Sequence, residues 1–262
     1  MKKILFCIVC LLSFSVSADV ASLGNKIDQD NINMGLTLGF KYYEGRYVEQ
    51  DYYKAREYFE LAANKGSDVA LSMLAGMYAE GKGVKQDYQK AKEYLELAAD
   101  KGNLPAQTML ASLYFDGQGI KQDYSKAKKY FELAADRGDI KAQEMLGLMY
   151  YNGQGTEPDF YKAKKYLELA ADKGITIAQA ILGVMYAEGQ GVKQDYQKAK
   201  WYLESAADKR SAIAQAMLGS MYAEGYGVEQ NLDKAKEYFG LSCDNGEQYG
   251  CDAYAKLNKK GF

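Results

Sequence analysis

Residues 142–174 read AQEMLGLMYYNGQGTEPDFYKAKKYLELAADKG, and near copies of this stretch fill most of the 262-residue chain. One of its alanines, Ala163, recurs at a spacing of 36 residues. The series is Ala55, Ala91, Ala127, Ala163, Ala199 and Ala235. Two tyrosine series, one through Tyr150 and one through Tyr166, follow the same spacing. A fixed period of this length indicates a repeat architecture in which every repeat is one supersecondary unit.

Each repeat predicts two helices. In the second repeat, Ala70, Leu74 and Tyr78 are spaced as on one face of a helix. Gly81 interrupts this helix, and Asp87 is placed to cap the next one. A single helix pair cannot bury its apolar face, whereas stacked pairs can. The sequence therefore predicts an all-α fold, a right-handed α/α superhelical solenoid of six 36-residue helix-pair repeats plus a C-terminal capping helix.

The first 18 residues form a separate segment. Lys2 and Lys3 precede an apolar run over 4–12 that is too short to span a membrane, and residues 16–18 (Val-Ser-Ala) resemble a cleavage site. We expect a signal peptide over 1–18, with a membrane anchor as the alternative, and no transmembrane segment in the mature chain. Residues 19–30 are expected to be an N-terminal cap or a loose segment. The solenoid is expected over 31–262, with repeats at 31–66, 67–102, 103–138, 139–174, 175–210 and 211–246 and a cap at 247–262.

The composition argues against most enzymes and nucleic-acid readers. Histidine is absent, which removes Ser-His-Asp and Cys-His nucleophile systems and the usual zinc sites. The formal net charge of −2 argues against non-specific nucleic-acid binding. The 35 carboxylates almost all recur with the repeat, and no irregular pair stands out as a catalytic acid and base. We predict no catalytic residue, no metal and no cofactor.

The repeated pattern is A-x-x-x-L-G-x-M-Y-x-x-G-x-G-V, followed by D-x-x-K-A-x-x-Y-x-x-L-A-A-x-x-G. It resembles the Sel-one-like repeat (SLR), a subclass of tetratricopeptide-like helical repeats. The resemblance covers nearly the whole mature chain and implies scaffold and adaptor roles. For exported bacterial proteins of this kind it implies host interaction or envelope regulation.

Two cysteines, Cys243 and Cys251, remain after the expected cleavage. An even pair in an exported chain suggests a disulfide. The spacing of the pair also resembles that of cysteine-rich secreted SLR proteins, where such pairs are disulfides. We expect the bond to hold the C-terminal cap in place, with a redox site as the alternative.

In tetratricopeptide-like stacks the first helices line the concave face, and the resemblance implies the same here. Two variable positions per repeat would then point into a groove. The expected partner-binding residues are Phe40, Tyr43, Phe115, Leu148, Tyr151 and Val184, with the last four at the centre of an apolar patch. The alternative is that some of them pack between neighbouring first helices.

An acidic ridge is expected beside the groove. Its members are Glu44, Glu80, Asp116, Asn152, Glu188 and Glu224. Acids at a helix C-terminus oppose the helix dipole, which suggests a use such as contact with a basic segment of a partner. The alternative is a solvated rim that pairs with lysines such as Lys85 and Lys121.

Two departures from the repeat lie close together. Ser205 stands where the other repeats have leucine, and Arg210 replaces the glycine that ends the second helix. We therefore expect a looser joint between the fifth and sixth repeats. Trp201, the single tryptophan, lies beside this joint and is either a functional exposed residue or a cover for the joint.

Together these features predict a non-enzymatic, exported scaffold or adaptor, periplasmic or secreted, that recognises a protein segment in its concave groove. Binding of cell-wall polymers or cell-wall enzymes is the first alternative. A weak penicillin-binding or hydrolase activity is the second. We expect no nucleic-acid partner, and the sequence does not identify the protein partner.

Overall fold

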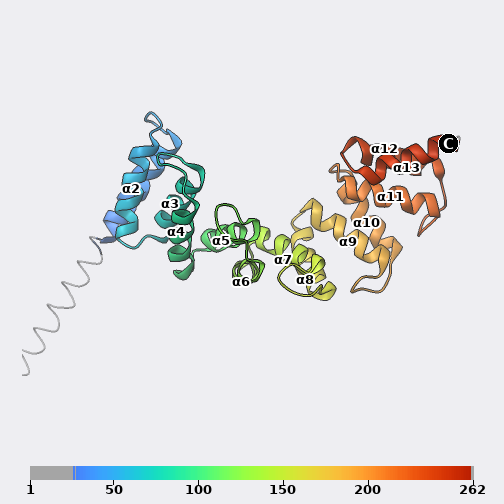
Figure 1. Ribbon diagram of the computed structural model, residues 1–262, viewed down its shortest axis with the longest axis horizontal. Coiled ribbons are helices and arrows are strands. Elements are labelled where there is room, and N and C mark those ends of the chain that lie inside the picture. The colour runs from blue at the N-terminus through green and yellow to red at the C-terminus, as the bar shows by residue number, and fades with distance from the viewer. Residues whose placement is uncertain (1–25, 27, 261–262) are drawn as a thin grey trace, which may run out of the picture. The chain divides into compact units, whose positions relative to one another are not determined.

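The computed structural model describes residue 26 and residues 28–260, so the expected signal peptide and most of the segment 19–30 lie outside the described residues. All regular secondary structure in the described part is helical (Figure 1). A helix over 28–44 precedes the others. The remaining helices are α2 (Tyr52–Asn64), α3 (Asp68–Glu80), α4 (Tyr88–Asp100), α5 (Leu104–Asp116), α6 (Tyr124–Ala135), α7 (Ile140–Asn152), α8 (Phe160–Asp172), α9 (Thr176–Glu188), α10 (Tyr196–Ala207), α11 (Ala212–Glu224), α12 (Leu232–Asp244) and α13 (Gln248–Lys259).

The helix ends follow the capping residues of the repeat. The Asp87 carboxylate accepts a hydrogen bond from the Lys90 backbone N–H at 3.0 Å and starts α4. Gly81 ends α3 in the left-handed conformation, with φ 71°. The same pair of signals recurs around α7 and α8, where Gly153 and Asp159 play these parts. The expected two helices per repeat are confirmed.

The chain forms two compact units, and the boundary lies between Gln122 and Asp123, in the loop that joins α5 to α6. The first unit contains α2–α5, and the second contains α6–α13. Within each unit, helices that follow each other in sequence pack against each other. The alanines of the 36-residue series are fully buried, and larger side chains such as Leu146 and Leu167 fill the space between helices.

The two tyrosine series form stacked pairs inside the repeats. The ring centroids are 5.6–6.0 Å apart in the pairs Tyr42–Tyr58, Tyr78–Tyr94, Tyr150–Tyr166, Tyr186–Tyr202 and Tyr222–Tyr238. The Tyr150 hydroxyl donates to Glu132 Oε1 at 2.7 Å. Burial, and then this hydrogen bond, raises the pKa of Tyr150. These tyrosines therefore serve packing, with their hydroxyl groups at a polar edge.

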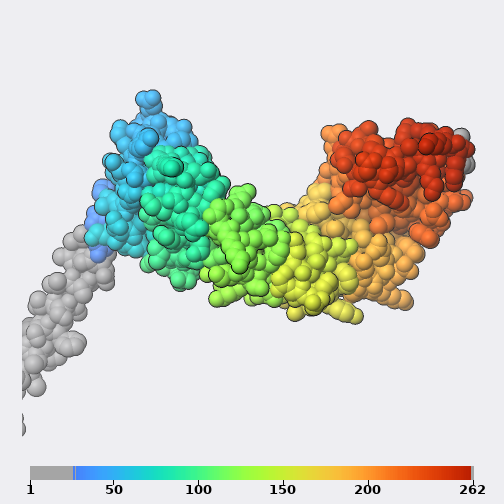
Figure 2. Space-filling model, viewed as in Figure 1, coloured from blue at the N-terminus to red at the C-terminus, as the bar shows by residue number. Residues whose placement is uncertain are grey.

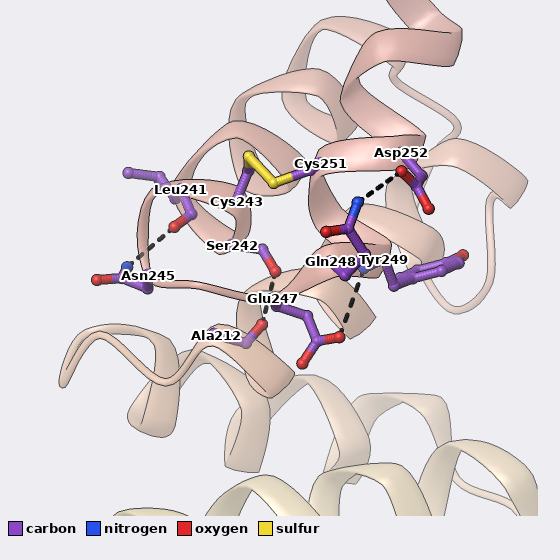
Figure 3. Close-up of a disulfide and its surroundings, with 10 residues drawn as sticks. All are labelled: Ala212, Leu241, Ser242, Cys243, Asn245, Glu247, Gln248, Tyr249, Cys251 and Asp252. Atoms are coloured by element: carbon purple, nitrogen blue, oxygen red, sulfur yellow. Dashed lines mark hydrogen bonds between the residues drawn. A yellow bond between two sulfur atoms is a disulfide. The ribbon is translucent and has the colours of Figure 1, made fainter.

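The C-terminal helix α13 packs against α12, and in Figure 2 the two form one continuous red surface. Figure 3 shows the disulfide between Cys243 of α12 and Cys251 of α13, which confirms the predicted pairing. The Ser242 hydroxyl donates to the Ala212 carbonyl at 2.9 Å and connects α12 to α11. A Cβ atom at Gly250 would lie 2.5 Å from Ser242 Oγ, so only glycine permits this close contact between α12 and α13.

The joint between α10 and α11 retains its backbone hydrogen bonds despite Arg210. Arg210 adopts φ 65°, the conformation that glycine takes in the other joints. Its N–H donates to the Ala207 carbonyl at 2.8 Å, as the Gly174 N–H does to Ala171. The leucines that Ser205 replaces are exposed, for example Leu97 at 54%. The departures therefore introduce backbone strain and remove an exposed leucine, but they break none of the hydrogen bonds of the joint.

Candidate partner-binding face

The first helices of the repeats pack side by side in the second unit. Helix α7 contacts α9, α9 contacts α11, and α11 contacts α13. We call the surface of these four helices the first-helix face. It places the predicted groove residues of this unit, Leu148 and Tyr151 on α7 and Val184 on α9, on neighbouring helices.

Tyr151 is half-buried on this face, on a helix that contacts the neighbouring α9, which ends at Glu188. Its ring packs edge-on against Phe160, with the centroids 5.6 Å apart. Burial, and then the charge of the Glu188 carboxylate, raises the pKa of Tyr151. Leu148, one turn earlier on α7, is also half-buried. An aromatic ring, an aliphatic side chain and a carboxylate are thus present together.

Val184 is only 8% exposed, and its neighbour Ala187 is 7% exposed. In α9 every residue from Ala178 to Ala187 is buried. Val184 therefore packs within the unit and offers little surface to a partner, which corrects its expected place in an exposed patch. The alternative of packing between first helices applies to this residue.

The predicted residues of the first unit pack mainly within their own repeat. Phe40 and Tyr43 each lie edge-on to Phe59, with centroid distances of 5.2 and 6.4 Å. The Lys82 ammonium group donates to the Tyr43 hydroxyl at 3.2 Å. Phe115 is half-buried on α5 and belongs to this unit, whereas Leu148 and Tyr151 belong to the other.

All six positions of the acidic ridge are exposed. In the first unit Glu44 pairs with Arg46, and Glu80 pairs with Lys82, each at 2.6 Å. The hydrogen bond that Lys82 donates to Glu80, and then the one that it donates to the Tyr43 hydroxyl, raises the pKa of Lys82. The partners are thus residues two positions along the chain, not the lysines expected from the sequence.

The acids of the second unit differ from those of the first. Arg46 and Lys82 correspond to Gln190 and Tyr226, which carry no charge. The Glu188 carboxylate accepts a hydrogen bond from Gln190 Nε2 at 2.7 Å. No ion pair within 4.0 Å joins Glu188 or Glu224 to a cation in the part of the chain that the structure describes. In this respect the two carboxylates differ from those of Glu44 and Glu80, which are paired.

The lysines of the second helices are held against the tyrosine pairs. Their ammonium groups lie 4.8–5.3 Å from ring centroids in the pairs Lys54–Tyr42, Lys90–Tyr78, Lys162–Tyr150, Lys198–Tyr186 and Lys234–Tyr222. This geometry is typical of cation–π contacts. Trp201 is 63% exposed on α10, and its ring lies edge-on to Tyr202 at 4.7 Å. Trp201 thus combines an exposed indole surface with a ring contact to the tyrosine that follows it.

Neither a metal centre nor a membrane span is evident in the described part. No group of three or more histidine, cysteine, aspartate or glutamate side chains among residues 28–260 is arranged to hold a metal ion. None of the helices over the same residues has the length and hydrophobicity needed to cross a bilayer.

One feature of the first-helix face was missed at the sequence level. A cavity of about 310 Å³ lies among α11, α12 and α13, with Lys256 and Lys260 on its rim. The 36-residue spacing of the repeats could have pointed to it. Lys256 falls 36 residues after Ser220, and Lys260 falls 36 residues after Glu224, so the cap carries lysines where the repeats do not.

Comparisons with known proteins agree with the repeat pattern. The Sel1 repeat model matches six times, at residues 32–67, 68–103, 104–139, 140–175, 176–211 and 212–247. Proteins of this kind generally mediate protein–protein interaction, and Sel1-repeat scaffolds are typically non-catalytic. No protein of curated function is significantly similar to the chain in sequence.

Among the solved structures that are similar to the chain, two are 32% identical to it. A protective antigen of uropathogenic Escherichia coli that displays an SLR fold is 32% identical, with a TM-score of 0.80 over 89% of this chain. This chain spans only 50% of that protein's length. A Sel1 repeat protein from Oxalobacter formigenes is also 32% identical, with a TM-score of 0.65 over 81% of this chain and 87% of the other. From the repeats and these comparisons we conclude that the chain belongs to the Sel1 repeat family.

Proposed function

We propose that the chain is an exported, non-enzymatic adaptor that binds a segment of a protein partner on the first-helix face of its second unit. The observation that carries this proposal is the environment of Tyr151. A half-buried aromatic ring lies on α7, which contacts the helix α9 that ends at the exposed Glu188, and no ion pair joins Glu188 to a cation among the described residues. Buried aromatic anchors and unpaired charges at the rim are features of protein-binding surfaces.

The charge of the face favours a basic partner segment. Glu188 and Glu224 are both exposed and stand one repeat apart on neighbouring helices. A segment with lysine or arginine side chains would offset the cost of carboxylates at helix C-termini. The partner's apolar side chains would contact Leu148 and Tyr151. Complementary charge would then contribute mainly to the association rate and to specificity.

Export is supported by the predicted signal peptide and by the disulfide between Cys243 and Cys251, because disulfides persist in oxidising compartments. The similar E. coli protein is described as a protective antigen, which is compatible with a protein that leaves the cytoplasm. We infer a periplasmic or secreted location.

A paired pull-down tests the proposal. The baits are residues 19–262 of the wild type and a Leu148→Lys/Tyr151→Lys variant, presented to envelope and host extracts and read by mass spectrometry. The matched control is Tyr161→Lys/Leu169→Lys on α8, where both side chains are exposed. Circular dichroism first establishes equal helicity of all baits. The proposal expects a protein that binds the wild type and the control but not the α7 variant. Equal capture by all three baits would contradict it.

A further inference from the structure

The cavity at the C-terminal end of the first-helix face combines an apolar floor with a charged rim. The floor contains Leu232, Phe239 and Leu257, and the rim contains Glu224, Lys256 and Lys260. Phe239 is 4% exposed and Leu257 is 9% exposed, so the floor is part of the packed core. A volume of about 310 Å³ falls at the lower end of the range for small-ligand sites, about 300–1,000 Å³.

One wall of the cavity is fixed by a polar contact between α11 and α13. Ser220 Oγ and the Tyr249 hydroxyl are hydrogen-bonded to each other at 3.1 Å. The Tyr249 ring lies edge-on to Phe239, with the centroids 5.9 Å apart. The disulfide holds α13 against α12, as Figure 3 shows, and both helices line the cavity. The cavity is therefore built from braced elements, which favours binding with little rearrangement.

The rim carries positive charge at positions where the equivalent residues of the repeats are acidic or uncharged. Lys260, the C-cap residue of α13, stands at the ridge position of the cap, and Lys256 precedes it by four residues, about one helical turn. Glu224, an acidic residue of the ridge, also lines the cavity. No ion pair within 4.0 Å joins Glu224 to either lysine in the described residues. The rim thus offers two cations and one anion at separate places.

We propose that this cavity binds the C-terminal residue of a partner polypeptide, an inference that rests on the proposed function and specifies its partner. A C-terminal residue with a large apolar side chain carries that side chain and a carboxylate on the same Cα atom. The side chain would fill the floor, and the carboxylate would lie between the Lys256 and Lys260 ammonium groups. A basic residue upstream would pair with Glu224. Capture of a terminal carboxylate is one of the recurring modes of peptide recognition.

Fluorescence anisotropy with synthetic peptides tests the inference. The probes are fluorescein-labelled octapeptides of one sequence, with two arginines at positions three and four and a final residue of phenylalanine, leucine or alanine. Each is made as the free acid and as the C-terminal amide. The expected result is saturable binding of the phenylalanine and leucine acids, about tenfold tighter than of the amides or of the alanine peptide.

Variants of the purified chain locate the site. Lys256→Glu/Lys260→Glu is expected to weaken binding of the free acids by about tenfold or more. The matched control is Lys173→Glu/Lys193→Glu, which changes the net charge equally at exposed positions outside the cavity. A second variant, Ala253→Trp, fills the cavity and leaves the lysines in place, so it is expected to abolish binding at unchanged helicity.

The outcomes separate this inference from the proposed function. Failure of every free-acid peptide to bind the wild type, or equal binding by the Lys256→Glu/Lys260→Glu variant and its control, would overturn the inference. Equal affinity for acids and amides would also overturn it. The proposed function depends instead on the Leu148→Lys/Tyr151→Lys variant in the pull-down, which leaves the cavity intact.

Discussion

Replacing Arg210 by glycine is expected to stabilise the chain. Arg210 has φ 65°, and a residue with a Cβ atom pays about 1–2 kcal/mol in this left-handed conformation. Glycine removes this cost, but its greater conformational freedom in the unfolded state lowers the stability by about 0.4–1 kcal/mol. The Arg210 side chain is exposed, and the hydrogen bond from its N–H to Ala207 is retained. The expected net gain is about 0.5–1 kcal/mol in the free energy of unfolding.

Gly174 provides the matched control one repeat earlier. It has φ 81°, and a Cβ atom there meets only the flexible end of Lys209, at 3.5 Å. Gly174→Ala therefore introduces the strain that Arg210→Gly removes, without a packing clash. We expect it to lower the free energy of unfolding by about 1 kcal/mol.

Urea titration followed by Trp201 fluorescence and by circular dichroism measures both effects. Trp201, the single tryptophan, lies on α10 directly before the Arg210 joint, so its emission reports on this part of the chain. Circular dichroism reports on all helices and shows whether the array unfolds as one unit. A midpoint for Arg210→Gly at or below that of the wild type, with Gly174→Ala unchanged, would refute the strain argument.

Three further perturbations have defined outcomes. Cys243→Ser/Cys251→Ser is expected to lower the free energy of unfolding by about 2.5 kcal/mol, because the disulfide closes a short loop. Thermal melts with and without reductant measure this loss, and equal melting temperatures would contradict the expectation. Burial, and then the Glu168 carboxylate, raises the pKa of Tyr202 to about 12, so its contribution to stability is present below pH 10 and lost as the pH rises to 12. Tyr202→Phe should therefore reduce the loss of stability in alkaline titrations, and an unchanged profile would argue against it. Hydrogen bonds from the first turn of α8 lower the pKa of Asp159, so its contribution is present above pH 4 and lost as the pH falls; Asp159→Asn should flatten the acid limb of the stability profile.

The fold could be predicted from sequence because most local signals recur in all or nearly all of the six repeats. Alanines at the 36-residue spacing are fully buried, and the capping aspartates and turn glycines lie at the predicted helix ends. The disulfide was predictable because two cysteines remain after the expected cleavage and their spacing places them on consecutive helices. In each case a short-range pattern fixes the structure, so a single sequence contains enough information.

The candidate site was less predictable because surface exposure depends on neighbouring helices. Val184 occupies the same repeat position as Leu148, yet it is buried in a helix in which every residue from Ala178 to Ala187 is buried. Glu80 is paired with Lys82, two positions along the chain, and the residue at this position differs between repeats. The C-terminal cavity depends on how α13 packs at the end of the array, which the repeat pattern does not specify.

Site-specific photocrosslinking tests most directly whether the first-helix face of the second unit binds the partner. A benzophenone amino acid is placed at Tyr151 on α7 in one protein and at Tyr161 on α8 in another, and both are irradiated in the extract that yields the partner. Tyr161 is 78% exposed whereas Tyr151 is half-buried, so exposure alone favours a crosslink at Tyr161. Our account predicts a covalent adduct with the same protein from Tyr151 and none from Tyr161. An adduct from Tyr161 and none from Tyr151 would contradict it.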